Sequence, residues 1–340
     1  MPSIYDVAII GGGPAGLTDG IWLARYLHSV VLIDSGDPRH WETRGVNGFL
    51  GMPHARPADL RAAGRDECRK YGVELIDGFV AKVVKDGDDA FCVEYDPMPV
   101  TKAVLDGEGS GAPRAPDDNE PRDCTVDLQA RRVLLAFGLK DEWPRVPGLR
   151  QVYGSTAHVC PDCDGYETRG MRVAVIGSGR KAVGLALNLA TWTSDIVICT
   201  NGEEAGLEPE YQSKLDALGI AVVTDHLTGI DADDASIRAL LLENGGRIPC
   251  DKVFFKLSQR PADDLGAQLG CERDDEGQIV TDGHGHTSVY NVFAAGDIAP
   301  GPQLAIAAAA EGAIAALASH KSLVPAERKL AKREPATAEP

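Results

Sequence analysis

The pattern of apolar and polar residues predicts the same unit twice along the chain: an apolar strand, a glycine turn and a helix. The two repeats span 5–34 and 172–200. Their expected elements are strands at 5–10, 30–34, 172–176 and 195–200, turns at 11–16 and 177–179, and helices over roughly 14–28 and 180–193. Because strands alternate with helices in both repeats, we predict an α/β fold in which helices cover mainly parallel sheets.

The rest of the chain continues this pattern with two exceptions. The further expected elements are a helix near 57–71, strands near 73–76, 79–84, 90–95, 131–137, 220–224, 251–257 and 289–297, and a helix over 303–319. Residues 96–123 are rich in acids and glycine, and we expect a flexible excursion between two strands there. Residues 326–340 are charged and contain proline, which predicts a disordered tail.

Composition limits the classes of function. The 340 residues leave room for about two domains. The 51 acidic and 34 basic side chains give a net charge of −17, which argues against nucleic acid or an anionic membrane as a partner. The sequence shows no apolar run of bilayer length and no secretory pattern, so we expect a cytoplasmic protein with no membrane partner.

The first glycine turn carries the pattern of a dinucleotide site. Gly11, Gly13 and Gly16 fit G-x-G-x-x-G between a strand and a helix, with Pro14 and Ala15 inside the turn. The glycines allow a tight turn and a close approach of the backbone to a pyrophosphate, which the helix N-terminus attracts. Asp34 follows about twenty residues later, where an acid binds ribose hydroxyls.

The second glycine turn is less complete. Gly177 and Gly179 begin it, and Arg180 and Lys181 could contact a phosphate. The next strand ends at 200–202 with neither an acid for a ribose nor an arginine cluster for a 2′-phosphate. Two interpretations stay open, a nicotinamide nucleotide or a retained fold whose ligand site is weakened or altered.

Cys160 and Cys163 form the one closely spaced pair among eight cysteines. Because no second C-x-x-C exists, half a zinc site is disfavoured and we expect no metal. A silent pair of buried thiols is the other alternative, but C-x-x-C suits dithiol–disulfide exchange. Asp164 could move a proton to or from a departing thiolate, or cap a helix. His158 is a candidate second base or a packing histidine.

Together these motifs resemble the low-molecular-weight thioredoxin reductase family of FAD-dependent pyridine nucleotide-disulfide oxidoreductases. The resemblance covers nearly the whole chain, and Ala294-Ala-Gly-Asp297 is similar to the family's second FAD signature. It implies FAD as cofactor. The implied FAD contacts are Gly11, Gly13, Pro14, Ala15, Gly16, Asp34, Asn47, Gly138, Gly296, Asp297, Gln303, Leu304 and Ala305.

The resemblance also implies an architecture of two Rossmann-like, three-layer nucleotide-binding domains, the second inserted into the first. The FAD domain would comprise 1–152 and 281–325, and the second domain 153–280 would carry the cysteine pair. The implied assembly is a homodimer.

The chemistry implied by the resemblance places Cys163 at the flavin, Cys160 at the substrate, and Asp164 as proton donor. The implied partner is a thioredoxin-like protein or a small dithiol or disulfide. NADPH or NADH is a candidate ligand of the second turn, but the family's arginine-rich segment is missing after 200–202 and Gly184 replaces an acid.

These departures leave several functions open. The same residues would serve a disulfide reductase fed by ferredoxin or another flavin, or a dithiol oxidase that uses oxygen. An alternative from another class is a non-enzymatic, redox-sensing flavoprotein. The degenerate second cleft could also accept a second flavin.

Overall fold

The computed structural model describes residues 4–87, 89–98 and 126–330. Most of the predicted excursion at 96–123 lies outside the described residues, as does 331–340 of the predicted tail. Within the tail, η2 (Ala326–Arg328) is a short 3₁₀ helix.

The first sheet has six strands in the order β1-β2-β3-β4-β5-β16, with an additional pairing of β1 and β5. Its strands are β1 (Tyr5–Ile10), β2 (Val30–Asp34), β3 (Glu74–Lys85), β4 (Phe91–Pro97), β5 (Val126–Leu135) and β16 (Val292–Ala294). The pairings of β1 with β2 and β5, of β2 with β3, and of β5 with β16 are parallel, whereas β3, β4 and β5 form an antiparallel meander. The strands β1 and β2 are buried on both faces, which is why they read as continuous apolar runs.

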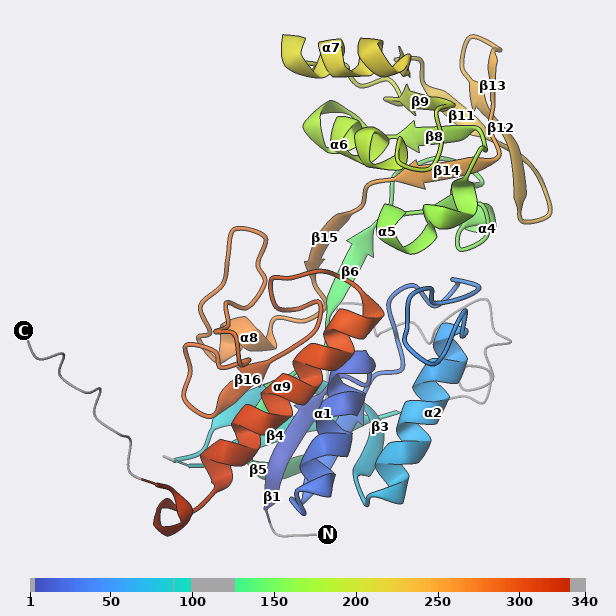
Figure 1. The fold of residues 1–340 in the computed structure, drawn as a ribbon. Coiled ribbons are helices and arrows are strands. Elements are labelled where there is room, and N and C mark those ends of the chain that lie inside the picture. Colours follow the sequence, from blue (N-terminus) through green and yellow to red (C-terminus); the bar gives the residue numbers. More distant parts are fainter. Residues whose placement is uncertain (1–3, 88, 99–125, 331–340) are drawn as a thin grey trace, which may run out of the picture.

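Three helices cover one face of this sheet: α1 (Pro14–Arg25), α2 (Pro57–Lys70) and α9 (Ala305–Leu323) (Figure 1). The helices α1 and α9 pack closely because a Cβ on Gly312 would lie only 2.1 Å from the backbone oxygen of Ala15. Residues of the meander cover the other face, where Val80, Phe91 and Val93 join the core.

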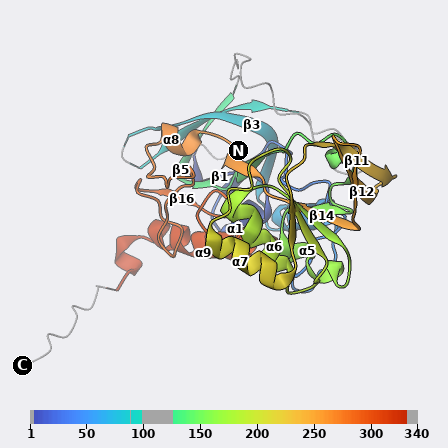
Figure 2. The same cartoon turned by 90° about the horizontal axis from the view of Figure 1, so that it is seen from above.

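The second sheet is parallel, with the order β10-β9-β8-β14-β7. Its strands are β7 (Ala157–His158), β8 (Val173–Ile176), β9 (Ile196–Cys199), β10 (Ala221–Val223) and β14 (Lys252–Phe255). The helices α6 (Gly179–Leu189) and α7 (Pro209–Leu218) accompany it, and β11 (Leu227–Asp233), β12 (Ser236–Leu242) and β13 (Arg247–Pro249) form a separate antiparallel sheet (Figure 2). The predicted fold class, α/β with two Rossmann-like units, is therefore confirmed.

Two antiparallel strands, β6 (Leu139–Glu142) and β15 (Ser258–Pro261), run between the two sheets (Figure 1). Helix α8 (Leu265–Gln268) follows β15, and Leu265, Cys271 and Ile279 pack in the core of the first sheet. We therefore propose that the inserted domain ends near β15, earlier than the boundary at 280 expected from the sequence. The remaining short helices are α4 (Leu149–Val152), α5 (Pro161–Asp164) and η1 (Tyr166–Thr168).

Asp19 on α1 is fully buried, and its carboxylate oxygens have no hydrogen-bond partner among the described residues. Burial raises the pKa of Asp19 well above its usual range, so the folded protein holds a proton that the unfolded chain releases above about pH 4. This group therefore lowers stability increasingly as the pH rises from about 4 toward the folded pKa.

Asp19→Ala is accordingly expected to raise the free energy of unfolding at pH 8 by about 1–3 kcal/mol, with a smaller gain near pH 4. Urea denaturation at the two pH values measures both differences. An equal gain at both pH values, or a loss at pH 8, would contradict the account of Asp19.

Candidate active site around the Cys160–Cys163 disulfide

Cys160 and Cys163 are joined by a disulfide at the start of α5, and both are half-buried. Cys160 is the N-cap of α5, and its Sγ accepts a hydrogen bond from the backbone N–H of Cys163 at 3.1 Å. Pro161 takes the first helical position, where its missing N–H costs nothing. The pair predicted from the sequence is thus close enough to exchange between dithiol and disulfide.

Gly165 sets the path of the chain after the pair. A Cβ at this position would lie 2.5 Å from the oxygen of Pro161 and 2.6 Å from the ring of Trp192. Only glycine fits between them, so the spacing from the cysteines to Gly165 reflects packing against Trp192.

Asn47 links the disulfide to the part of the chain that forms the first sheet. Its Nδ2 donates to the backbone oxygen of Cys163 at 3.0 Å, and its Oδ1 lies 3.1 Å from Nδ1 of His54. Asn47 belongs to the segment between β2 and α2, whereas Cys163 belongs to the second half. The residue predicted as an FAD contact therefore lies directly against the cysteine pair.

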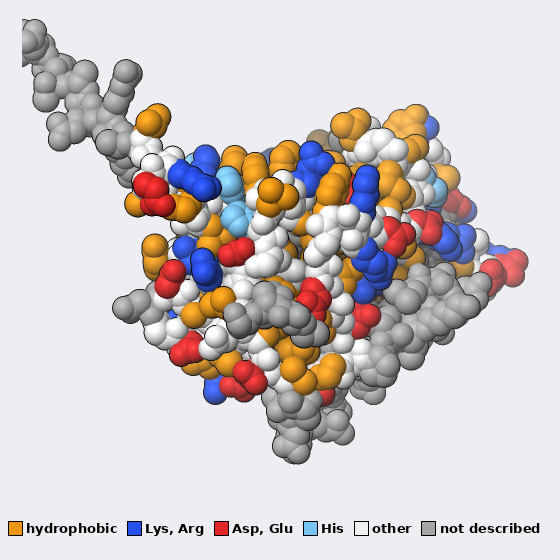
Figure 3. All heavy atoms as spheres, turned by 90° about the horizontal axis from the view of Figure 1, so that it is seen from below, with side chains coloured by type: hydrophobic (Ala, Val, Ile, Leu, Met, Phe, Trp, Pro, Cys, Tyr) orange, Lys and Arg blue, Asp and Glu red, His pale blue; other side chains and the backbone are white. Residues whose placement is uncertain are grey.

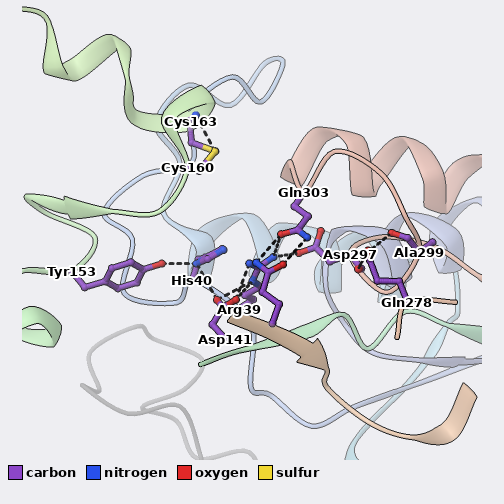
Figure 4. A network of polar contacts seen from close by, with 11 residues as sticks. Arg39, His40, Asp141, Tyr153, Cys160, Cys163, Gln278, Asp297, Ala299 and Gln303 are labelled. Atoms are coloured by element: carbon purple, nitrogen blue, oxygen red, sulfur yellow. Dashed lines mark hydrogen bonds and ion pairs between the residues drawn. A yellow bond between two sulfur atoms is a disulfide. The ribbon is translucent and has the colours of Figure 1, made fainter. Parts of the chain in front are cut away.

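Figure 4 shows a polar network centred on Arg39 in the same view as the cysteine pair, with no contact drawn between the two. Arg39 Nη1 donates to Asp297 Oδ2 at 2.8 Å and to Gln303 Oε1 at 2.7 Å, and its Nε donates to Asp141 at 2.9 Å. Asp297 and Gln303 were expected from the sequence, whereas Arg39 was not, because a single arginine in a loop has no spacing signal. Arg39 brings these two predicted residues together.

His40, beside Arg39, is neutral at physiological pH. Burial, assisted by the positive charge of the Arg39 guanidinium, lowers the pKa of His40 to about 4. Its Nδ1 is hydrogen-bonded to the hydroxyl of Tyr153 (Figure 4). The network therefore contributes one cation, Arg39, between the carboxylates of Asp141 and Asp297.

The first glycine turn has the shape that a pyrophosphate needs. Gly11 has φ +110°, and a Cβ there would lie 2.3 Å from the oxygen of Ala136. A Cβ on Gly16 would lie 2.0 Å from the oxygen of Gly11, so both positions require glycine. The space in front of Gly13 is open within 4 Å, and Pro14 begins α1 directly after it. This open cradle at a helix N-terminus fits the diphosphate of FAD.

The other predicted FAD contacts lie near this turn or at the start of α9. A Cβ on Gly296 would lie 2.9 Å from the Cβ of Ala15. The N–H of Gly296 donates to the carboxylate of Glu311 at 2.9 Å. Leu304 is the N-cap of α9 and Ala305 its first residue. Gly138, with φ +69°, immediately precedes β6.

Asp34 is part of a buried ion cluster. It accepts hydrogen bonds from Arg61, from Arg65 at 3.3 Å, and from the N–H of Gly36 at 3.1 Å. Arg61 and Arg65 lie one helical turn apart on α2, and the Nε of each is buried without a partner among the described residues. A ribose at Asp34 would share the carboxylate with two arginines, which were not expected from the sequence although their i, i+4 spacing was visible.

The second glycine turn is covered by the loop 200–206. The Ser178 hydroxyl donates to the Glu203 carboxylate, and the N–H of Gly179 donates to the oxygen of Ala205 at 3.2 Å. Gly177 and Gly179 have positive φ angles, as a dinucleotide turn requires, but Arg180 and Lys181 are exposed beside it. The hydroxyl of Ser178 and the amide of Gly179 are thus both bonded to this loop, and the carboxylate of Glu203 lies at the turn.

Over the stretches of chain that the structure describes, no group of three or more His, Cys, Asp or Glu side chains could hold a metal ion. In the same residues no helix combines the length and apolar character needed to cross a membrane.

Comparisons with known proteins identify the family. The model of the pyridine nucleotide-disulphide oxidoreductases matches residues 5–312. A component of the alkyl hydroperoxide reductase of Pseudomonas putida is 26% identical over 330 residues, 94% of this chain, and the chain spans only 58% of that protein's length. The thioredoxin reductase tcpT of Claviceps purpurea is 27% identical over 312 residues, 87% of each chain.

Two solved structures share the fold over almost the whole chain. HlmI is 32% identical, with a TM-score of 0.82 and coverage of 95% of this chain and 93% of HlmI. The thioredoxin reductase of Streptococcus pyogenes is 25% identical, with a TM-score of 0.80 and coverage of 95% and 99%. The chain therefore belongs to the pyridine nucleotide-disulphide oxidoreductase family, which confirms the resemblance to thioredoxin reductases and the expectation of an FAD-dependent oxidoreductase.

Proposed function

We propose that the protein is an FAD-dependent dithiol–disulfide oxidoreductase whose Cys160 and Cys163 exchange electrons with a substrate thiol pair. The observation that carries the proposal is the disulfide itself, which Asn47 holds against the FAD half of the molecule. A purely structural disulfide would not need to lie at the contact between the two halves.

The chain's residues fit FAD. Gly11, Gly13 and Gly16 would hold its diphosphate, and Asp297 and Gln303 both accept hydrogen bonds from Arg39 (Figure 4). When bound, FAD supplies a carrier for two electrons. Arg39 would then set the local charge around Asp297.

The thiol chemistry proceeds by two exchanges. A substrate thiolate attacks Sγ of Cys160, the bond between Cys160 and Cys163 breaks, and the electron pair stays on Cys163 as a thiolate. The second substrate thiolate then attacks the substrate sulfur of the mixed disulfide. Cys160 leaves as a thiolate and takes a proton from Asp164, so that substrate dithiol becomes disulfide and the protein's disulfide becomes thiol and thiolate.

The direction we propose is dithiol oxidation, with oxygen as the final acceptor of the two electrons and hydrogen peroxide as the product. This choice follows from the second turn. There the Ser178 hydroxyl and the Gly179 N–H, which NADPH or NADH would need as donors, already donate to Glu203 and to the oxygen of Ala205. The alternative is a reductase of a thioredoxin-like disulfide, fed by ferredoxin, another flavin or a nicotinamide.

Oxygen uptake with dithiothreitol tests the proposal. The purified protein in air is expected to consume one oxygen molecule for each dithiothreitol oxidised, in proportion to enzyme concentration. Negligible turnover with dithiothreitol, with or without NADPH and a disulfide, would instead favour the non-enzymatic redox sensor. Turnover only with NADPH and a disulfide would favour the reductase.

We further propose that the protein is a homodimer that pairs through α9. Ile306, Ile314 and Leu317 are exposed on α9, and Trp22 is exposed on the neighbouring α1. Seen from below, the molecule shows hydrophobic side chains interspersed with acidic and basic ones (Figure 3). Exposed apolar side chains gathered on one helix often mark a contact surface, and a second copy would cover these. Sedimentation equilibrium tests the assembly, and we expect the mass of two chains.

The cytoplasmic location stays a prediction.

A further inference from the structure

His158 stands two residues before Cys160, on the edge strand β7 of the second sheet. Its side chain is only 8% exposed, and its Nδ1 lies 3.3 Å from Oδ1 of Asp164. On the other side of the ring, Nε2 lies 3.1 Å from Nζ of Lys252 on β14. The ring of Phe254 packs beside the imidazole, with 5.5 Å between ring centroids. His158 thus connects two ionisable groups through its two nitrogens.

The contact with Lys252 fixes where His158 carries its proton. A lysine ammonium has donors and no acceptor, and Lys252 also donates to the backbone oxygen of Ser155 at 2.7 Å. Nε2 of His158 therefore accepts from Lys252, and the neutral imidazole keeps its proton on Nδ1, which faces Asp164. A second proton on Nε2 would place two cations 3.1 Å apart.

We propose that Lys252, His158 and Asp164 form a proton relay that connects the redox cysteines to solvent. The inference rests on the proposed function, because the relay serves the proton that Asp164 gives to the Cys160 thiolate. Lys252 is half-buried and forms the solvent end, whereas His158 is the buried link.

The relay balances one proton. Asp164 gives its proton to the Cys160 thiolate, and the resulting carboxylate takes the Nδ1 proton of His158. Nε2 of His158 takes a proton from Lys252, which becomes a neutral amine and accepts the hydrogen bond from the new Nε2–H. When Cys160 is deprotonated, the same path runs in reverse and restores both the Nδ1 proton on His158 and the ammonium of Lys252.

The charged surroundings suit this transfer. Burial lowers the pKa of Lys252, which makes the ammonium a better proton donor, while the nearby Asp164 acts in the opposite direction. The other charged groups that act on Lys252 are Glu167 on η1, which favours its charge, and Arg44, which opposes it. A packing histidine in an apolar site would need no such chain of ionisable groups ending beside Cys163.

His158→Gln tests the relay, since glutamine keeps hydrogen-bonding capacity but cannot pass a proton from one nitrogen to another. We expect the rate at which dithiothreitol reduces the protein's disulfide, followed anaerobically by stopped flow, to fall about tenfold or more. Free imidazole in the buffer should restore part of the rate, and the pH profile of the variant should change. FAD content should equal that of the wild type.

His286→Gln is the matched control. His286 Nδ1 contacts Asp282 at 2.9 Å, a similar ion pair, but the pair is exposed and belongs to the segment before β16. This control should keep the wild-type rate and pH profile. Lys252→Met supplies a second test with the same expected direction, in case His158→Gln does not fold.

Two results would overturn the relay. The first is a wild-type rate and pH profile in both His158→Gln and Lys252→Met. The second is a loss of rate in both variants that imidazole does not restore and that leaves the pH profile unchanged, which would make His158 a packing residue. If the wild-type protein itself neither reacts with dithiothreitol nor turns over, the proposed function fails first and the relay fails with it.

Discussion

Cys160→Ser and Cys163→Ser variants are each expected to lose dithiol turnover by on the order of a thousandfold or more, because each removes one of the two sulfurs that change oxidation state. The disulfide between these residues is the one electron-carrying bond that the described residues form. Oxygen uptake with dithiothreitol measures the loss.

The two variants should fail at different steps. In Cys163→Ser, the free Cys160 thiolate can attack an added disulfide such as oxidised glutathione, which forms a mixed disulfide and releases one thiolate, but no Cys163 thiol is present to resolve that mixed disulfide. Cys160→Ser leaves Cys163 beside Asn47 and away from the incoming substrate. Mass spectrometry under non-reducing conditions should therefore detect an adduct on Cys160 of the Cys163→Ser variant more readily than on Cys163 of the Cys160→Ser variant.

Cys92→Ser is the control for loss of a thiol. Cys92 is a half-buried free cysteine on β4, in the sheet and away from α5. Its replacement should leave turnover unchanged. Full turnover in Cys160→Ser or Cys163→Ser would remove the disulfide from the mechanism.

Gly312→Leu is expected to give the largest effect on the fold. A Cβ at Gly312 would lie 2.1 Å from the backbone oxygen of Ala15, so any side chain forces α9 away from α1. Ala15 belongs to the first glycine turn, and a shift there would also open the cradle for FAD. We expect a loss of about 1–3 kcal/mol or more in the free energy of unfolding and a purified protein with little bound flavin.

Gly184→Leu is the matched control, since it makes the same replacement inside a helix. Gly184 is exposed on α6, and no atom lies within 4 Å of a Cβ placed there. This variant should keep its flavin and gain a few tenths of a kcal/mol, because leucine favours helix more than glycine does. Equal behaviour of the two variants, by urea denaturation and flavin absorbance, would rule out the close packing of α1 against α9.

Much of the fold was predictable because its main strands are short apolar runs next to glycine turns. The strands at 5–10 and 30–34 and the turn at 11–16 combine burial with a local φ requirement, and both signals are readable over a few residues. Helix α7 was missed because its side chains are mostly exposed and only Leu215 is fully buried. The strands between 227 and 249 were missed as well, although Ile237, Ala239 and Leu240 of β12 are buried.

The site was only partly predictable. The cysteines and Asp164 are neighbours in the sequence, so their spacing carried the signal. Arg39 and Asp297 are 258 residues apart, and Lys252 lies 94 residues after His158, so only the folded chain brings these pairs together. The position of Glu203 at the second turn depends on how the loop 200–206 folds back, and no pattern of single residues encodes that.

An anaerobic titration of the purified, FAD-loaded protein tests the central claim most directly. Dithiothreitol, NADPH and NADH are added to separate samples in steps of about one equivalent per flavin. The flavin absorbance near 450 nm is followed after each addition. The account predicts bleaching by dithiothreitol and no bleaching by either nicotinamide within the turnover time. Rapid bleaching by NADPH or NADH, with none by the dithiol, would contradict it.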